Sequence, residues 1–349
     1  MTLTSEQIRQ ALQTVKYPGF TRDIVSFGLV KRADMEEDTL TVHLQLTTAD
    51  PKIPETLRQQ ISEAALRLPG VASVHVEIEV TAPVTAATQA GGLPQEPIPG
   101  VQRIIAVGSG KGGVGKSTVA ANLAQSLQLE GQRVGLCDCD IYGPSIALMF
   151  ATHQSVYANQ ENRLIPLEQY GLKLMSMGFL MADDSPAILR GPMVTRYTQQ
   201  FLRNVEWGTL DYLILDLPPG TGDIQLTIVQ TVALAGAVVV TTPQEVALID
   251  ARKAVAMFHK VNVKVLGIVE NMSYFLCPND GNRYNIFGSG GGRSEAKRLD
   301  VPLLAEIPLE SEIRASGDSG KPITLSQPDS PTAQAFRKAA RHLIEVTSR

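Results

Sequence analysis

The sequence predicts an α/β protein with a mostly parallel, doubly wound sheet, preceded by a small α+β domain. From about residue 101, continuous apolar runs alternate with helical segments, which is typical of parallel strands that are buried on both faces. In the first 80 residues, apolar and polar residues instead alternate singly, as in strands with one side facing solvent. The length of 349 residues allows about two domains of roughly 150 residues.

Composition and charge exclude several broad classes of protein. Hydrophobic residues make up 44% of the chain and charged residues 19%, which excludes disorder of the whole chain. The net charge of −4 favours neither nucleic acid nor an anionic membrane as a partner. The polar N-terminus and the lack of an apolar run of about 18 residues predict a cytoplasmic protein without a membrane span.

The expected N-terminal domain covers residues 1–80 and has the order helix, strand, strand, helix, strand. Helices are expected after a capping-box spacing and after a proline, and strands where apolar residues cluster or alternate. In chain order, these elements are a helix after Thr4 and Gln7, strands at 24–30 and 40–46, a helix at 55–67 and a strand at 71–80.

A change of composition separates this domain from the rest of the chain. Residues 81–100 are rich in Ala, Thr, Pro and Gly and predict a flexible linker. The second domain is then expected over residues 101–349. Its strands are expected at 103–107, 133–137, 212–215, 237–240 and 263–269.

The first of these strands leads into a glycine-rich loop with the features of a phosphate-binding site. Residues 110–117 fit the pattern G-x-x-x-x-G-K followed by Ser or Thr, and a helix with an apolar face follows. Glycines let backbone N–H groups turn toward phosphate oxygens, and the N-terminus of the helix adds its dipole. Lys116 would lie on the β- and γ-phosphates, and Ser117 would offer its hydroxyl to Mg²⁺. The alternative is a plain glycine-rich turn.

A second lysine, Lys111, lies inside this loop. It could point into solvent, or it could reach a nucleotide bound by a partner subunit, which would imply a dimer. The run G-K-G-G-V-G-K-S-T resembles the deviant Walker A signature of the MinD/ParA/nitrogenase-iron-protein group of ATPases. The resemblance implies a P-loop NTPase fold, Mg²⁺ and ATP as ligands, and catalytic roles for Lys116 and for Lys111 across a dimer interface. The residues expected to contact ATP here are Gly110, Lys111, Gly112, Gly113, Val114, Gly115, Lys116, Ser117 and Thr118.

Aspartates follow two further strands. Asp138 and Asp140 end the second strand of this domain, and on an extended chain they share one face while Cys137 and Cys139 share the other. We expect the two cysteines to pack in the core, whereas loop capping is the alternative role of the two aspartates. Asp216 ends an apolar strand, where an acidic residue can hold Mg²⁺ through water.

Two segments are similar to the switch regions of the same ATPase group. Residues 137–145 are similar to its first switch, which implies that Asp140 orients the attacking water and that Asp138 lies nearer Mg²⁺. The run D-L-P-P-G-T-G-D that begins at Asp216 resembles the second switch of the Mrp/ApbC subfamily. The backbone N–H of Gly220 could contact the γ-phosphate and so sense hydrolysis, whereas a surface turn is the alternative for the Pro-Pro-Gly part of this run.

Two later positions match residues that contact the base in this group. Asn271 ends a predicted strand and matches the asparagine that reads adenine, since its amide can pair with the purine edge. Pro308 lies in the segment 307–310, where relatives place a second contact with the base.

The segment 273–288, with the glycine-rich tail that follows it, resembles the loop of the Mrp/ApbC iron–sulfur carrier family. Many members hold Cys-x-x-Cys there, and two such pairs can bind a 4Fe–4S cluster that bridges a homodimer. Here the second position is Asp280, and a carboxylate suits iron–sulfur iron less well than a thiolate does. Cys277 therefore either ligates a cluster together with its copy in the partner or is a structural cysteine. Three cysteines cannot form a four-cysteine site in one chain.

The family resemblance implies an ATP-hydrolysing homodimer that transfers iron–sulfur clusters to apo-proteins, together with cluster-assembly factors. Residues 22–30 resemble the small domain often fused to such proteins. This chain departs from that domain's acidic turn at 17–20 and from its cysteine loop at 47–51, so we expect a docking or regulatory role without a metal site.

The alternative function is a MinD/ParA-like positioning ATPase that holds no cluster. Such a protein would need a surface-binding tail, and residues 333–346 have the pattern of a basic amphipathic helix that includes Phe336. Helices of this kind more often pack on their own domain, so no membrane contact is expected.

Overall fold

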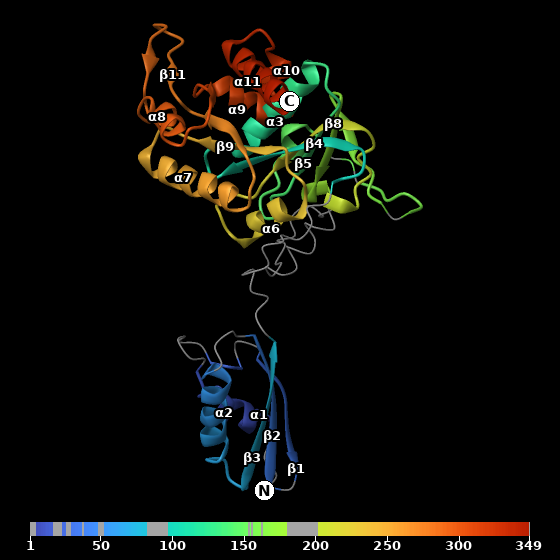
Figure 1. The fold of residues 1–349 in the computed structure, drawn as a ribbon, viewed down its shortest axis with the longest axis vertical. Helices are drawn as coiled ribbons and strands as arrows, with labels where there is room; N and C mark the ends of the chain where they lie inside the picture. Colours follow the sequence, from blue (N-terminus) through green and yellow to red (C-terminus); the bar gives the residue numbers. More distant parts are fainter. Residues whose placement is uncertain are drawn as a thin grey trace. The chain divides into compact units, whose positions relative to one another are not determined.

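The computed structural model describes residues 5–16, 23–25, 29–36, 38–47, 52–81, 97–152, 154, 156–161, 163–179 and 202–348. The chain divides into two compact units, residues 1–90 and 91–349, each of which has its own hydrophobic core (Figure 1). Most of the expected linker, residues 82–96, lies outside the described residues.

The N-terminal unit is a three-stranded sheet packed against helices. Its elements are α1 (Ser5–Leu12), β1 (Val30–Glu36), β2 (Thr39–Thr47), α2 (Lys52–Ala65) and β3 (Ser73–Thr81). Strand β2 is central, antiparallel to β1 and parallel to β3. The predicted alternation over 40–46 is confirmed, because Leu40, Val42 and Leu46 are fully buried against Leu57 and Ile61 of α2.

The predicted strand at 24–30 is wrong for the part of it that the structure describes, whereas residues 26–28 lie outside the described residues. Residues 24 and 25 lie in a turn, and strand β1 runs over Val30–Glu36. Ile24 is fully buried from a turn, where its N–H donates to the carbonyl of Val15 at 3.0 Å. The actual strand lies at the edge of the sheet, where only Ala33 and Met35 of its second half pack on the core. Such a half-exposed, charge-rich strand has little hydrophobic signal in the sequence.

The C-terminal unit is built on an eight-stranded sheet. Its strands are β4 (Val101–Ser109), β5 (Val134–Asp138), β6 (Leu167–Gln169), β7 (Leu172–Ser176), β8 (Leu210–Asp216), β9 (Gly236–Thr241), β10 (Val265–Glu270) and β13 (Leu303–Glu306). Two short strands, β11 (Phe275–Leu276) and β12 (Arg283–Tyr284), form a separate hairpin. The helical elements are α3 (Lys116–Leu129), α4 (Ile146–Met149), η1 (Met177–Phe179), α6 (Asp223–Thr231), α7 (Glu245–Lys260), α8 (Gly291–Arg298), α9 (Ser311–Asp318), α10 (Ile323–Ser326) and α11 (Pro331–Thr347).

The sheet has the order β13-β10-β9-β4-β8-β5-β7-β6, and every neighbouring pair is parallel except β6 with β7. Helices α3 and α11 lie on one face of the sheet and α6 and α7 on the other (Figure 1). The predicted α/β fold class is therefore confirmed. The five predicted strands correspond to β4, β5, β8, β9 and β10, whereas the short strands β6, β7 and β13 lacked a sufficient apolar run.

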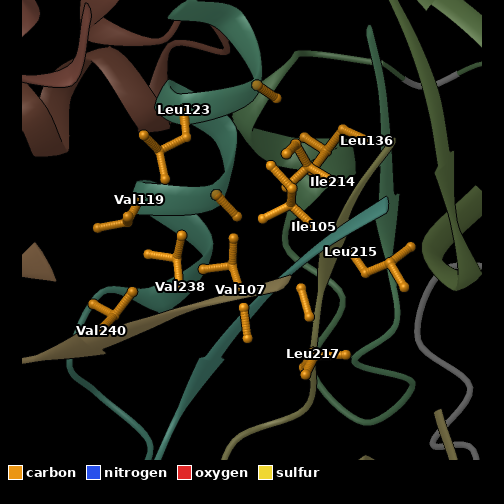
Figure 2. Close-up of a cluster of buried hydrophobic side chains, with 14 of the residues drawn as sticks. Ile105, Val107, Val119, Leu123, Leu136, Ile214, Leu215, Leu217, Val238 and Val240 are labelled. Carbon is orange, nitrogen blue, oxygen red and sulfur yellow. The ribbon is translucent and has the colours of Figure 1, made fainter. Parts of the chain in front are cut away.

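Apolar side chains from α3 and the central strands form the core of this unit. Figure 2 shows Val119 and Leu123 of α3 facing Val107 and Val238 of the sheet, all of them fully buried. Burying one such side chain contributes about 1.5–3 kcal/mol. This core fixes the carboxyl ends of β4, β5 and β8 relative to the first turn of α3.

The amphipathic C-terminal helix packs on its own unit. Phe336 and Leu343 of α11 are fully buried in the main core. Arg337 and Arg341 bind Glu130, at the end of α3, over 2.8 and 3.3 Å. The apolar face expected at 333–346 is therefore covered by α3 and its neighbours. No helix in the described part of the chain has the length and apolar character to span a membrane.

Candidate nucleotide site and cysteine hairpin

The glycine-rich loop connects the central strand β4 to helix α3, as the sequence predicts. β4 ends at Ser109, and α3 begins at Lys116. Gly113 and Gly115 have φ angles of 80° and 78°, in the left-handed region that favours glycine. Backbone N–H groups of this loop and of the first turn of α3 are therefore available for an anion at the carboxyl edge of the sheet.

Close packing also requires glycine at two of these positions. A Cβ at Gly110 would lie 2.1 Å from the backbone carbonyl carbon and oxygen of Asp250 in α7. A Cβ at Gly115 would lie 2.1 Å from Nδ2 of Asn271, which donates to the carbonyl of Val114 at 2.8 Å. The phosphate loop is thus held between α7 and the residue that follows β10.

Lys116 contacts Asp216 at the end of β8. The lysine side chain is only 7% exposed, its Nζ binds Oδ1 of Asp216, and it lies 3.2 Å from the hydroxyl oxygen of Ser117. Burial raises the pKa of the Asp216 carboxyl, and the charge of Lys116 opposes this rise. The buried Oδ2 of Asp216 accepts no hydrogen bond from the residues described.

Asp138 lies beside Asp216 on the neighbouring strand β5. It is fully buried, and burial followed by repulsion from Asp216 raises the pKa of its carboxyl to about 7. Asp138 accepts hydrogen bonds from the N–H groups of Asp140 at 3.1 Å, Ser145 at 2.9 Å and Ile146 at 3.1 Å, and from the hydroxyl of Ser176 at 3.1 Å. Asp138 therefore shapes the loop that carries Asp140. The sequence did not indicate that Ser176 contributes to this arrangement.

These groups fit a magnesium ion. Asp138 and Asp216 are two buried carboxyl groups that share one buried cation, Lys116. Asp216 has an oxygen atom without a partner among the described residues, and the hydroxyl of Ser117 is close to Lys116. Carboxylate and hydroxyl oxygens are the ligands that Mg²⁺ prefers, and a second positive charge would offset the repulsion between the two acids.

The two cysteines at the end of β5 are buried in the core. Cys137 and Cys139 are 0% and 1% exposed, and their sulfur atoms lie 3.9 Å apart. A hydrogen bond with Cys137 and burial raise the pKa of the Cys139 thiol, so this thiol stays protonated. The packing role expected for this pair agrees with its position.

Gly220 and Asn271 have backbone partners in this structure. The N–H of Gly220, expected at the γ-phosphate, donates to the carbonyl of Ser109 at 3.0 Å. The amide of Asn271, expected at adenine, donates to Val114 in the phosphate loop. Pro308 is buried in the segment 307–309, which hydrogen-bonds to residues 273 and 274 at 2.8 and 2.6 Å. The two expected base-contact segments therefore lie next to each other.

The hairpin of β11 and β12 carries Cys277 at its turn. Cys277 is half-buried, and its N–H donates to the carbonyl of Asn282 at 2.9 Å. Asp280 accepts hydrogen bonds from the N–H of Asn282 at 2.8 Å and the hydroxyl of Tyr284 at 2.7 Å. These two bonds, with a weaker one from the Cys277 thiol, lower the pKa of the Asp280 carboxyl to about 2. Asp280 therefore stabilises the turn where many family members have a second cysteine.

No group of three or more His, Cys, Asp or Glu residues in the described part of the chain could hold a metal ion. Cys277 is accordingly not accompanied there by enough ligands for a cluster within one chain. A cluster at this hairpin would need thiols from outside the chain, as the count of three cysteines already indicated.

The parallel sheet, the glycine-rich loop and the aspartates at the carboxyl edge define a P-loop NTPase of the ParA/MinD class. The chain belongs to the family of NUBPL iron-transfer P-loop NTPases, whose model matches residues 100–344. Residues 5–78 match a second model, that of an iron–sulfur cluster assembly protein. The family resemblance and the fold class predicted from the sequence are both confirmed.

Relatives of known name cover most of the chain. The iron-sulfur cluster carrier protein of Deinococcus radiodurans is 48% identical over 97% of this chain and 94% of its own length. The iron-sulfur cluster transfer protein NUBPL of Dictyostelium discoideum is 50% identical over 71% of this chain and 77% of its own length.

Solved structures match the C-terminal unit. A nucleotide-binding protein from Archaeoglobus fulgidus in complex with ADP is 39% identical, with a TM-score of 0.59 over 68% of this chain and 92% of that one. The septum site-determining protein MinD from Pyrococcus horikoshii, complexed with Mg-ADP, is 25% identical, with a TM-score of 0.54 over 69% of this chain and 95% of that one.

Proposed function

We propose that the protein is an ATP-hydrolysing iron–sulfur cluster carrier that acts as a homodimer in the cytoplasm and delivers clusters to apo-proteins. The observation that carries this proposal is the position of Cys277. It is the one cysteine that is not buried, and it lies in the hairpin that follows Asn271, a residue whose own side chain contacts the phosphate loop. The family membership of the chain supports the same assignment of nucleotide and cargo.

ATP would bind to the backbone N–H groups of residues 110–118. Lys116 would exchange its contact with Asp216 for the β- and γ-phosphates, and Ser117 and Asp216 would hold Mg²⁺. When bound, Mg²⁺ supplies positive charge that stabilises the phosphates. Asp140 would orient the attacking water, on a loop that the hydrogen bonds of Asp138 hold in place.

Lys111 would complete the site from the partner subunit. Its side chain makes no hydrogen bond or ion pair within the described part of the chain, whereas its backbone carbonyl accepts from the hydroxyl of Ser109 at 2.9 Å. A lysine held by its backbone at the loop, with its ammonium group free, can reach across an interface to a second nucleotide.

The cluster is the cargo, and Cys277 would be its ligand from each of two subunits. Asp280 is engaged in the hairpin turn, so its carboxylate is a poor candidate for a further ligand. The remaining ligands would be thiols of a small molecule or of the receiving protein, which suits a cluster that is bound only in transit. The N-terminal unit would dock cluster-assembly factors.

The alternative, a positioning ATPase without a cluster, has less support. Its surface-binding tail would be the apolar face of α11, but Phe336 and Leu343 in that face are already fully buried. The net charge of −4 also favours no nucleic-acid track.

Anaerobic reconstitution with iron and sulfide tests the proposal. The wild-type protein should gain a visible absorption band of a bound cluster, and Cys277→Ser should not. The matched control is Cys139→Ser, which removes a buried thiol and should keep the band. A band of equal intensity in Cys277→Ser, or none in the wild-type protein, would contradict the cargo assignment.

A further inference from the structure

We propose that Glu270 is a positioning residue that holds both ends of the cysteine loop, residues 273–292, and links this loop to the nucleotide site. The inference deepens the proposed function and rests on it, because it assumes that nucleotide binds at the phosphate loop. It concerns a residue for which the sequence indicated no role beyond the end of a strand.

One carboxylate connects the first and last residues of the cysteine loop. Glu270 is the last residue of β10 and is fully buried. Its Oε1 accepts a hydrogen bond from the hydroxyl of Ser273 at 2.5 Å, and its Oε2 accepts one from the N–H of Gly292 in α8. The hairpin with Cys277 lies between these two residues in the chain, and Figure 1 shows β11 on the loop that leads to α8.

The glycine run at the end of this loop is explained by the same contact. A Cβ at Gly292 would lie 2.6 Å from Oε2 of Glu270, and a Cβ at Gly291 would lie 2.6 Å from the carbonyl oxygen of Pro243. Only glycine lets the N-terminus of α8 approach Glu270 and the end of β9 so closely. The loop is thus closed by packing as well as by hydrogen bonds.

The next residue, Asn271, connects Glu270 to the phosphate loop. Its side chain donates to the carbonyl of Val114, and its backbone N–H donates to the carbonyl of Thr241 at 2.8 Å. Asn271 is 5% exposed and Ser273 is 1% exposed, so water has little access to the hydrogen bonds of these two residues. Stretching one of these hydrogen bonds therefore costs free energy that water does not restore. A shift of the phosphate loop on nucleotide binding therefore acts on Asn271, on Glu270 and then on both ends of the cysteine loop.

The chain provides a direct reporter of this coupling. Cys137 and Cys139 are buried and Cys277 is half-buried, so a thiol reagent added to the native protein reacts first with Cys277. The rate of this reaction depends on how the cysteine loop is held. It needs neither a bound cluster nor hydrolysis, only a nucleotide such as Mg-ADP.

The experiment measures the rate of Cys277 modification in the full chain with and without saturating Mg-ADP. In the wild-type protein, the nucleotide should change the rate by about fivefold or more. In Glu270→Ala, the rate should become nearly independent of the nucleotide while Mg-ADP still binds. Glu270→Gln should restore the dependence, since its amide oxygen can accept from Gly292 and its NH₂ group can donate to Ser273.

Glu295→Gln is the matched control. Glu295 is another buried carboxylate of α8, but its partner is Arg252 at 2.9 Å. Removing the charge of Glu295 should leave the effect of Mg-ADP on the rate of Cys277 modification unchanged. If Glu270→Ala does not fold, Ser273→Ala, which removes one of the two bonds, should reduce the effect.

Three outcomes would overturn the inference. They are a wild-type rate that bound nucleotide does not change, a wild-type effect that persists in folded Glu270→Ala, and an undiminished effect in Ser273→Ala. The proposed function fails separately, because it predicts Mg-ADP binding and a cluster band, which are measured by titration and by reconstitution. A wild-type protein that binds no nucleotide would overturn both.

Discussion

Gly110 and Gly112 of the phosphate loop have different surroundings, although both belong to the same motif. The position of a Cβ at Gly110 is filled by the backbone of Asp250 in α7, at 2.1 Å. A Cβ at Gly112 would have Cβ of Pro219 as its nearest neighbour, at 4.0 Å, and the φ angle of Gly112 is not in the left-handed region. One glycine is therefore required by packing, and the other is free of that requirement.

We predict that Gly110→Ala destabilises the C-terminal unit and that Gly112→Ala does not. The added methyl group at residue 110 must displace α7 from the loop, which should cost at least about 2 kcal/mol. Urea unfolding of the nucleotide-free protein measures the difference in free energy. Both substitutions replace glycine by alanine and therefore restrict the backbone of the unfolded chain to the same extent. Equal stability of the two variants would thus contradict the packing argument.

At the scale of single elements, an ion pair joins the starts of β5 and β8. Arg133 donates to Asp211 from its backbone N–H at 2.8 Å and from its guanidinium group at 2.7 and 3.0 Å. The guanidinium bond is the main reason that the pKa of the Asp211 carboxyl is lowered to about 2. An unfolded aspartate titrates near pH 3.9.

The stabilisation by this ion pair should therefore be complete above about pH 4 and lost as the pH falls toward 2. Asp211→Asn should lower the urea midpoint at pH 6, and its difference from the wild-type protein should shrink at pH 3. Asp318→Asn, in an exposed pair with Arg314, should shift the midpoint less at pH 6. A difference for Asp211→Asn that stays constant between pH 6 and pH 3 would contradict this prediction.

Substitutions in the C-terminal helix α11 test whether this helix is packed in the core. Phe336→Ala empties a fully buried position and should lower the free energy of unfolding by about 3–5 kcal/mol. Lys338→Ala, on the exposed side of the same helix, should change the free energy of unfolding by less than about 0.5 kcal/mol.

Liposome co-sedimentation tests the alternative, that α11 binds a membrane. ATP-dependent binding that requires Phe336 would favour the positioning ATPase.

At the scale of the whole molecule, the two lysines of the phosphate loop separate the role of the chain from that of the dimer. Lys116 is buried against Asp216 of the same chain, whereas Lys111 is proposed to act across the interface. Lys116→Ala should abolish hydrolysis through the site of its own chain. Lys111→Ala should keep ATP binding by the monomer and lose hydrolysis.

Steady-state ATPase rates and nucleotide titration measure these effects. Mixing Lys111→Ala with Lys116→Ala protein should restore part of the activity, because a mixed dimer has one site with an intact Lys116 that faces an intact Lys111. Normal turnover by Lys111→Ala alone would remove the role of this lysine across the interface.

Much of the fold and of the site could be predicted from local patterns. The phosphate loop, Asp216 and the five main strands follow from residues that are close in the sequence, where turn chemistry and apolar runs act directly. The edge strands β1, β6 and β13 and the short inner strand β7 could not be predicted, because strands that are short or half-exposed depend on the partner that they pair with.

By itself, the sequence determined the class of the protein, the position of its phosphate loop and the lack of a second cysteine beside Cys277. Only the tertiary structure decided that α11 buries its apolar face, that Asp280 holds the hairpin turn and that Glu270 joins the two ends of the cysteine loop. The physical reason is distance along the chain. A glycine motif acts through neighbouring backbone groups, whereas the partners of a buried carboxylate come from separate segments and are fixed only when those segments pack together.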